Sequence, residues 1–355
     1  ALSDGLDGIL GGNYSAEGGT DTRNYGGLEG IPEARALFAT MLEVPAEDIL
    51  VGGNSSLTLM YFTTFFALHL GVAGAQSAWC REGGSVKFLA PVPGYDRQFA
   101  ICEQLGIDMV PVPMRADGPD MDRVEEMVKA DPLIKGIWCV PRFSNPTGAV
   151  YSSEVVQRLA RLPGLAGPNF RVFCDNAYAV HTLADDAPVL DNVMAAFRAA
   201  GHGDALYLFG STSKITFAGA GVGFVAMSAA NRATVKGQLG ITQIGPDKVN
   251  QLRHVKLLRD AAGITQHMAA HAELLRPRFE TVIRRLREGL QGLGIAEWTE
   301  PLGGYFVSVD TRPGLAAKVV AMAAQAGVVL TPAGATYPGG EDPRDCNIRL
   351  APSYP

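Results

Sequence analysis

Short runs of almost wholly apolar residues recur through the first two thirds of this chain, and they constrain its fold more than any other feature. In order they are ILVGG (49–53), SVKFLAP (85–91), MVPVPM (109–114), IKGIWCVP (134–141), FRVFCD (170–175), ALYLFG (205–210) and VGFVAM (222–227). Helical stretches separate several of them, near 55–70, 95–105, 120–130 and 153–161. A strand that is apolar throughout is buried on both faces, which is typical of a mostly parallel sheet with helices on either side. The sequence therefore predicts an α/β fold in which residues 46–245 form a large three-layer α/β/α domain.

The rest of the chain has a different texture. Residues 247–292 are charged with helical periodicity and contain one proline, Pro277. This pattern predicts two helices, or one long helix kinked near that proline. Beyond them come the further elements GGYFVSVD (303–310), a helix near 315–326, VVLTPAG (328–334) and CNIRLAP (346–352). We expect residues 1–45 and 246–355 to form a smaller α+β domain.

Composition and charge exclude several classes of protein. A chain of 355 residues suits a large domain and a smaller one, and a net charge of −6 offers no basic surface for nucleic acid or an anionic membrane. The longest apolar runs are interrupted by Thr, His and Gly, and the first residues lack a basic start, so we expect neither a membrane span nor a signal peptide. Five cysteines show no CxxC spacing, and four of them lie in apolar stretches. Such thiols are typical of a reducing compartment, which predicts a cytoplasmic protein.

The stretch FGSTSKITFAGAGVGF (209–224) holds one charged residue, Lys214, which is the only Asp, Glu, Lys or Arg between Ala205 and Asn231. An ammonium group in apolar surroundings loses hydration, so its pKa falls toward neutrality. A neutral amine can condense with an aldehyde and can then act as a base. A lysine that snorkels to the surface is the structural alternative, which the serines before Lys214 and the glycines after it make weaker.

Three polar motifs follow apolar runs, at the strand ends where parallel sheets bind ligands. In GGNSS (52–56), the amides of Asn54, Ser55 and Ser56 would open a helix and suit a phosphate, although a simple serine cap explains them equally well. In SNPTG (144–148), the amide of Asn145 could donate to a ligand oxygen, with a plain turn as the alternative. In CDNAY (174–178), Asp175 leaves a buried strand and needs a partner, either a local cap or a cation such as a protonated ring nitrogen.

A fourth candidate is Arg349, which lies between Ile348 and Leu350 in the apolar run CNIRLAP. A guanidinium in such a place pairs well with a bidentate carboxylate. That carboxylate could belong to a substrate or to a buried neighbour, and the residue alone does not separate the two.

In their order, these motifs resemble those of the fold-type I, pyridoxal 5'-phosphate (PLP) dependent aminotransferases of class I/II. The resemblance runs from DTRNYGGLEGIPEAR (21–35) to NIRLAP, and DTRNYGG, SNPTG and SKITFAGAGV are most similar to the bacterial aspartate aminotransferase-like subgroup. It implies a homodimeric transaminase without a metal, acting on an amino acid and a 2-oxo acid. Aspartate and 2-oxoglutarate are the favoured pair.

The resemblance also implies a role for each residue around the cofactor ring. Lys214 would form a Schiff base with PLP and move the substrate proton. Asp175 would pair with the pyridinium nitrogen, and Asn145 and Tyr178 would hydrogen-bond the phenolic oxygen. Tyr95, in APVPGYDRQF, would stack on the ring.

The same resemblance places the phosphate beside a set of small polar residues, joined by a tyrosine from the partner subunit: Asn54, Ser55, Ser56, Ser211, Ser213 and Tyr25. Arg349 would bind the substrate's α-carboxylate together with Asn145, and Arg23 or Arg142 would read a distal carboxylate. Members of the family usually carry a phosphate-binding arginine about eight residues after the lysine, where this chain has Val222.

Other interpretations stay open. A β-elimination lyase could use the same fold and cofactor, and aminotransferase-like domains also serve as effector-binding halves of transcription regulators. His267 and His271 are four residues apart on a predicted helix, a spacing that can bind zinc. Without a third ligand nearby, we expect them to lie on a solvated helix face.

Overall fold

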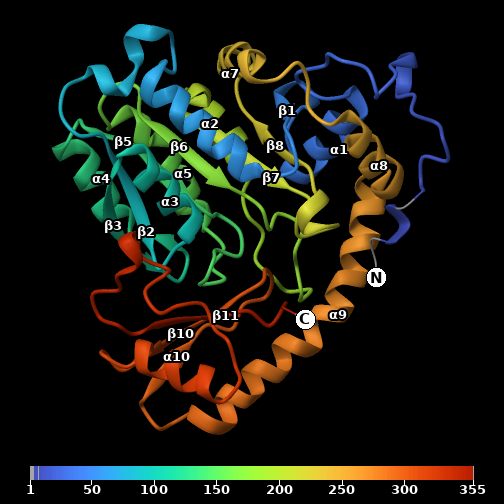
Figure 1. The fold of residues 1–355 in the computed structure, drawn as a ribbon. Coiled ribbons are helices and arrows are strands. Elements are labelled where there is room, and N and C mark those ends of the chain that lie inside the picture. Colours follow the sequence, from blue (N-terminus) through green and yellow to red (C-terminus); the bar gives the residue numbers. More distant parts are fainter. Residues whose placement is uncertain (1–3, 7, 355) are drawn as a thin grey trace.

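The computed structural model describes residues 4–6 and 8–354, and these form two β-sheets joined by a long helix (Figure 1). The large sheet has eight strands in the order β1-β8-β7-β6-β5-β2-β3-β4. Its strands are β1 Ile49–Val51, β2 Lys87–Val92, β3 Asp108–Arg115, β4 Gly118–Pro119, β5 Ile134–Cys139, β6 Arg171–Asp175, β7 Leu206–Ser211 and β8 Gly223–Ala226. Five neighbouring strands, β7, β6, β5, β2 and β3, are parallel, whereas β8 is antiparallel to both of its neighbours. The predicted α/β fold with a mostly parallel sheet is confirmed.

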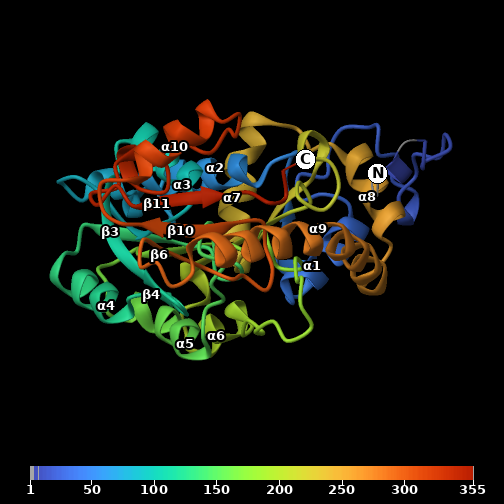
Figure 2. The ribbon, with the colours of Figure 1, turned by 90° about the horizontal axis from the view of Figure 1, so that it is seen from below.

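Helices cover both faces of the large sheet. The helices of the chain are α1 Pro32–Leu42, α2 Ser56–His69, α3 Asp96–Leu105, α4 Met121–Ala130, α5 Ser153–Arg161, α6 Val193–Ala199, α7 Ala229–Thr242, α8 Lys248–Leu258, α9 Ala261–Leu290 and α10 Ala316–Gln325. Of these, α10 lies beside the small sheet. Seen from below, α2 and α3 lie on one side of the sheet and α4, α5 and α6 on the other (Figure 2). Successive side chains of a strand point to opposite faces of the sheet. In β6, Phe173 packs with the helix layer that contains α2, while Val172 and Cys174 pack with the layer that contains α5.

A glycine allows the large sheet to approach the start of α2. A Cβ atom on Gly223 of β8 would lie 2.5 Å from the backbone nitrogen of Ser56, which is closer than real Cβ atoms come. Ser55 begins the helix there, because its hydroxyl accepts a hydrogen bond from the Leu57 amide over 3.2 Å. Part of the glycine-rich stretch after Lys214 therefore serves tight packing.

The charged segment after residue 246 forms two helices, but the break does not fall at the proline. Helix α8 ends before Arg259, which has a positive φ of 62°, and α9 begins after Asp260, whose side chain caps the Gly263 amide at 2.8 Å. Pro277 lies inside α9, which is 30 residues long in total. Of the two predicted alternatives, two helices are therefore confirmed, and the capped break between them lies at Asp260, 17 positions before Pro277.

The small sheet has the order β11-β10-β9, with strands β9 Ala296–Trp298, β10 Val307–Thr311 and β11 Asn347–Leu350. Helix α10 and the C-terminal half of α9 pack against it (Figure 1). The run VVLTPAG (328–334), which resembled a further element, forms neither strand nor helix, and its Val329 is 90% exposed. An apolar run without a partner edge gains no ladder hydrogen bonds, so composition alone does not make it a strand.

The division of the chain at residues 46 and 246 stays a prediction. Helix α1, from the N-terminal segment, packs against β1, β7 and β8 of the large sheet and against α8. Among the described residues, no helix has the length and apolar character needed to cross a membrane.

Candidate active site

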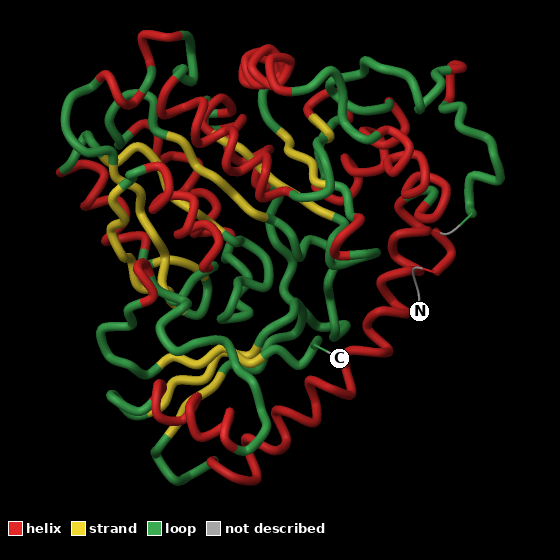
Figure 3. Tube along the Cα trace, in the orientation of Figure 1, coloured by secondary structure: helices red, strands yellow, loops and turns green. Residues whose placement is uncertain are grey.

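Three of the predicted residues lie where strands of the large sheet end. Asp175 is the last residue of β6, Lys214 follows β7, and Asn145 follows β5. The loops after these strands gather between the large and the small sheet (Figure 3). The carboxyl ends of neighbouring parallel strands thus bring the three residues to one edge, where open α/β sheets bind ligands.

Asp175 is a buried carboxylate with one oxygen free to receive a ligand. Its Oδ2 atom accepts a hydrogen bond from Nε2 of Gln98 over 3.4 Å, whereas Oδ1 is buried and has no partner among the described residues. Burial raises the pKa of Asp175 to about 6, an effect that the nearby charge of Lys214 opposes. A buried acceptor with no donor is costly, so Oδ1 fits a cationic N–H group such as a protonated ring nitrogen.

The amine of Lys214 lies beside this carboxylate and over an aromatic ring. Its Nζ atom is 4.7 Å from the centroid of Tyr178, which is itself buried. Loss of hydration lowers the pKa of Lys214, and the charge of Asp175 partly offsets the effect. The lysine residue as a whole is partly exposed, whereas its amine has the lowered pKa of a group withdrawn from water. A snorkelling lysine would keep its ammonium in water, which does not describe this side chain.

The backbone just after the amine is held from two sides. The carbonyl oxygen of Lys214 accepts hydrogen bonds from the Tyr305 hydroxyl at 2.5 Å and from His181 Nε2 at 3.1 Å. The next carbonyl, of Ile215, accepts from Nε2 of His267 at 2.8 Å and of His271 at 3.0 Å. These contacts fix the peptide from which the lysine side chain projects.

The position of His267 and His271 corrects the expectation of a solvated helix face. Both rings are partly buried between α9 and the Lys214 loop, because the Ile215 carbonyl needs donors there. Within the described part of the chain, no group of three or more His, Cys, Asp or Glu side chains could hold a metal ion.

The predicted phosphate residues also meet. The Ser211 hydroxyl donates to the Ser213 hydroxyl at 2.8 Å, and that hydroxyl donates to the Asn54 carbonyl oxygen at 3.3 Å. Because Ser55 and Ser56 open helix α2, hydroxyls and helix amides converge next to Lys214, which is an arrangement that binds anions. Val222, where an arginine is usual, is buried and donates its amide to Thr212 Oγ1 at 2.8 Å, so this position supplies no charge.

Tyr95, Asn145 and Arg349 form the side of the site that faces the small sheet. Tyr95 and Asn145 line the same small cavity. Arg349, on β11, donates from Nη1 to Asn145 Oδ1 at 3.2 Å and to Asp96 Oδ1 at 2.8 Å, and its guanidinium carbon lies 5.0 Å from the Phe306 ring centroid. Arg349 therefore has a carboxylate partner inside the protein.

Three other predicted residues lie apart from this group within the chain. Arg142 donates to Thr182 Oγ1 at 3.2 Å and lines a cavity with Glu43 and Asn176 instead. Arg23 pairs with Asp21 at 2.8 Å on the surface, and this contact lowers the pKa of Asp21 to about 2. Tyr25 is 85% exposed. Their predicted roles stay predictions, and for Arg23 and Tyr25 these roles depend on a partner subunit.

Sequence reasoning missed Gln98, His181 and Tyr305, which contact Asp175 or the Lys214 carbonyl. Gln98 alone left a signal, since it is a polar residue on the buried face of the short helix that follows Tyr95. His181 and Tyr305 lie in loops whose meeting point depends on the complete fold.

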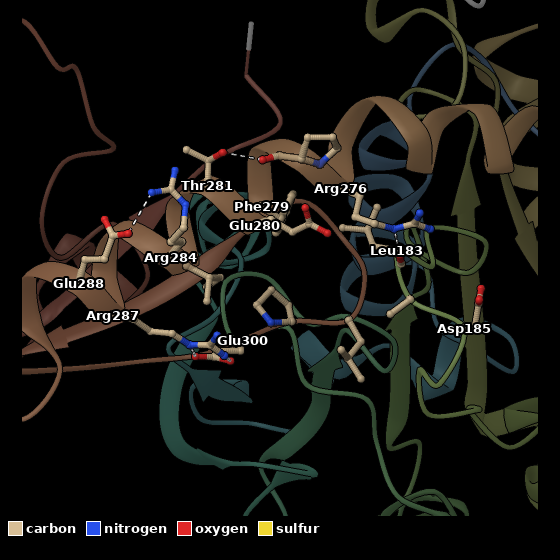
Figure 4. Close-up of a pocket in the computed structure, with 15 residues that line it drawn as sticks. Leu183, Asp185, Arg276, Phe279, Glu280, Thr281, Arg284, Arg287, Glu288 and Glu300 are labelled. Atoms are coloured by element: carbon tan, nitrogen blue, oxygen red, sulfur yellow. Dashed lines mark hydrogen bonds and ion pairs between the residues drawn. The ribbon is translucent and has the colours of Figure 1, made fainter.

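A separate groove of about 790 Å³ lies between α9 and the loops at 183–185 and 300–302 (Figure 4). Several of its charged groups already have partners, since Arg284 pairs with Glu288 at 3.0 Å and Arg287 pairs with Glu300. Arg276 Nε likewise donates to the Leu183 carbonyl oxygen at 2.7 Å. These pairings are typical of a solvated surface, and the groove contains none of the residues that surround Lys214.

Comparison with known proteins agrees with this geometry. A family model described as aspartate amino-transferase matches residues 1–355. An aspartate aminotransferase of Corynebacterium glutamicum is 48% identical over 344 residues, covering 97% of this chain and 79% of the relative. The crystal structure of an aspartate transaminase from that species has a TM-score of 0.93 and 46% identity, covering 100% of this chain and 84% of that one.

A more distant structure shares the fold alone. It is an α-aminoadipate aminotransferase from Thermus thermophilus, complexed with N-(5'-phosphopyridoxyl)-L-leucine. Its TM-score is 0.78 at 21% identity, covering 99% of this chain and 82% of that one. With the family match over the whole length and the identity to the Corynebacterium enzyme, the conclusion is that this chain belongs to the aspartate aminotransferase family and is a transaminase.

Proposed function

We propose that this transaminase binds PLP at Lys214 and exchanges an amino group between an amino acid and a 2-oxo acid, with aspartate and 2-oxoglutarate as the favoured pair. The observation that carries the proposal is the amine of Lys214, with its lowered pKa, beside a buried carboxylate whose Oδ1 atom has no partner among the described residues. The name of the Corynebacterium relative supports aspartate as a substrate. The phosphopyridoxyl ligand of the Thermus enzyme supports the cofactor.

The residues around Lys214 suit the ring of that cofactor. Asp175 Oδ1 would accept a hydrogen bond from the ring nitrogen. Because the Asn145 amide oxygen already accepts from Arg349, its NH₂ group is left to donate to the phenolic oxygen, together with the Tyr178 hydroxyl. Tyr95 would cover one face of the ring. When bound, PLP supplies an electron sink that stabilises negative charge at the substrate's α-carbon.

Lys214 would then move the proton at that carbon. A base works best when its pKa lies near the working pH, and burial shifts this amine in that direction. The tyrosine and histidine bonds to its carbonyl oxygen would limit where the side chain can reach. Orientation of this kind is a large part of enzymatic rate enhancement.

The phosphate would bind at the start of α2. The helix has 14 residues, and its first amides together with the Ser55 hydroxyl offer donors but no full positive charge. The hydroxyls of Ser211 and Ser213 now donate within the protein and would turn toward the phosphate. Phosphate binding would therefore rest on hydrogen bonds and the helix dipole. Tyr25 of the partner subunit would add a further donor.

A homodimer is supported by an exposed apolar patch, defined as Tyr25, Ile241 and Ile244. These side chains are 85%, 84% and 62% exposed, respectively. Their segments lie side by side, because a Cβ atom on Gly245 would come within 2.3 Å of the Gly26 carbonyl oxygen. Contiguous apolar surface of this kind marks interaction sites.

All five cysteines are free and four are buried, which supports a cytoplasmic location.

Subunit complementation tests the shared site. Chains carrying Lys214→Ala and chains carrying Tyr25→Ala would each be inactive or weak alone. A mixed dimer would recover activity, because its Tyr25→Ala chain keeps Lys214 and receives Tyr25 from the other chain. Equal inactivity of the mixed and separate dimers would contradict the proposed role of Tyr25.

Lys214→Ala tests the central assignment. We expect the parent protein to be yellow, borohydride to fix PLP to Lys214, and the variant to lose turnover. Lys318→Ala, at an exposed lysine on α10, is the control and should keep the yellow colour, the fixation of PLP by borohydride and the turnover of the parent. A variant indistinguishable from the parent in PLP content and turnover would falsify the assignment.

A panel of amino donors against 2-oxoglutarate tests the substrate and the reaction. Ping-pong exchange between an amino acid and a 2-oxo acid is expected. A β-elimination lyase would instead release ammonia and pyruvate from a single substrate. An effector-binding domain would bind a ligand without turning it over.

A further inference from the structure

Asp96 and Arg349 form an ion pair between the parts of the molecule that carry the two sheets. Asp96 lies in the first turn of α3, on the large sheet, whereas Arg349 lies on β11 of the small sheet. Nη1 of the arginine is 2.8 Å from Oδ1 of the aspartate, and the two side chains are 11% and 32% exposed. The Asp96 carboxylate thus binds the Arg349 guanidinium, which in the proposed function binds the carboxylate of the substrate.

The Nη1 nitrogen of the guanidinium has no N–H group to spare while this pair is intact. Nη1 carries two N–H groups and has two acceptors, Oδ1 of Asp96 and Oδ1 of Asn145. Nε is buried without a partner among the described residues. Nη2 makes only a long contact of 3.4 Å to Thr331 Oγ1.

A carboxylate that binds an arginine with both oxygens needs two adjacent N–H groups. A ligand carboxylate on the Nη1–Nη2 edge needs one N–H group of Nη1, so one of the two acceptors must then leave Nη1. Asn145 lies in the backbone turn 144–148 and is 4% exposed, whereas the Asp96 side chain is 32% exposed. The charge of Asp96 also lies near the start of α3, where the helix dipole stabilises it without the arginine. Asp96 is therefore the partner that can leave.

We propose that Asp96 is a resident competitor, which holds Arg349 until the α-carboxylate of the substrate displaces it. This inference rests on the proposed role of Arg349 as the carboxylate-binding residue. The competition makes Asp96 a specificity-determining residue, because an amine without a carboxylate cannot displace it. Binding would also exchange a link between the two sheets for a link to the ligand.

Asp96→Asn in the holoenzyme tests this exchange, since it keeps the shape and removes the charge. We expect the Kd values of succinate and propionate, measured by spectral titration, to fall by the same factor of about three to ten. The KM values of donor and acceptor should fall similarly. Asp96→Ser gives the same measurement if Asp96→Asn accumulates poorly.

Two other results would overturn the proposal. A larger gain for succinate than for propionate would indicate a general change of electrostatic potential, because the effect would then scale with ligand charge. Weaker binding of both ligands would show that Asp96 orients Arg349 for the substrate.

Asp122→Asn is a matched control. Asp122 also lies in the first turn of a helix, α4, and pairs with an arginine, Arg158, at 2.7 Å. Its substitution changes the net charge by the same amount, so unchanged Kd values are expected. An equal tightening in Asp122→Asn would refute the competition.

Arg349→Gln separates this inference from the proposed function. Unchanged affinity for both ligands would mean that Arg349 does not bind the carboxylate, and both proposals for it would fail. Loss of binding in Arg349→Gln without tightening in Asp96→Asn would leave the role of Arg349 standing and remove the competition alone.

Discussion

The hydroxyl of Tyr305 donates a hydrogen bond to the backbone carbonyl oxygen of Lys214 over 2.5 Å. Tyr305 lies just before β10, so the small-sheet side of the molecule holds the peptide that carries the Lys214 amine. Burial raises the pKa of Tyr305 to about 12, which keeps its hydroxyl protonated and able to donate at neutral pH.

Tyr305→Phe should lower the free energy of unfolding by about 0.5–1.5 kcal/mol, the usual contribution of one hydrogen bond. The loss should be modest because His181 still donates to the same oxygen at 3.1 Å. Urea denaturation measures it, and turnover should fall with it as the lysine loses orientation. Tyr354→Phe, at a residue 82% exposed, is the control; an equal effect there would contradict the role of Tyr305.

The affinity of the cofactor-free protein for PLP should depend on pH through Asp175. Its pKa of about 6 means that the carboxylate becomes neutral as the pH falls through that value and then loses its attraction for a ring cation. PLP affinity should therefore decline below about pH 6. Fluorescence titration from pH 5 to 8, roughly one unit or more on each side of that pKa, measures the decline. Asp175→Asn should bind weakly with little dependence on pH, and an equally steep profile in that variant would assign the titration to another group.

The two histidine bonds to the Ile215 carbonyl should behave non-additively. A carbonyl oxygen has two lone pairs, so His267→Ala leaves the bond to His271, and the reverse also holds. Only the double variant leaves the acceptor without a donor, which adds a desolvation cost of about 1–3 kcal/mol. A double-mutant cycle on the free energy of unfolding should thus show a double variant less stable than the sum of the single effects. Strict additivity would mean that water replaces the rings.

Gly223→Ala should weaken both the fold and the proposed phosphate site. The new methyl group would lie 2.5 Å from the Ser56 nitrogen, so α2 or β8 must shift. Overpacking of this kind typically costs about 1–3 kcal/mol. Gly219→Ala is a matched control from the same stretch, since no atom of the described residues lies within 4 Å of its added Cβ. Thermal unfolding and PLP affinity should change in the first variant and not in the second.

Features written locally in the sequence were predictable. The sheet follows from runs that are apolar on both faces, and Lys214 stands out because its neighbours along the chain carry no charge. Gln98 and Tyr305 were not predictable in the same way, because they meet Asp175 and Lys214 across 77 and 91 positions. Contacts at such separations are set by packing, which one sequence does not display.

Two features of the C-terminal part have local causes. The sequence predicted two helices or one helix kinked near Pro277, and the structure has two helices, whose break is set earlier by the positive φ of Arg259 and the Asp260 cap. An aspartate before AAGIT was a cap signal of the ordinary kind and could have located it. The run at 328–334 is apolar in composition but pairs with no strand among the described residues, so it forms no β-strand despite its strand propensity.

Helix α9 makes a lever of the connection between the two sheets. It has 30 residues, and at 1.5 Å per residue it is roughly 45 Å long. His267 and His271 fasten it near its first turns to the Ile215 carbonyl, while its far end packs behind the small sheet. From these histidines to Leu290 the helix runs about 28–35 Å, so rotation by about 5° around the fastened point would carry the far end through ~3 Å. The fixed point of such a rotation would lie next to Lys214, so the position of its amine would change little while the small sheet moves.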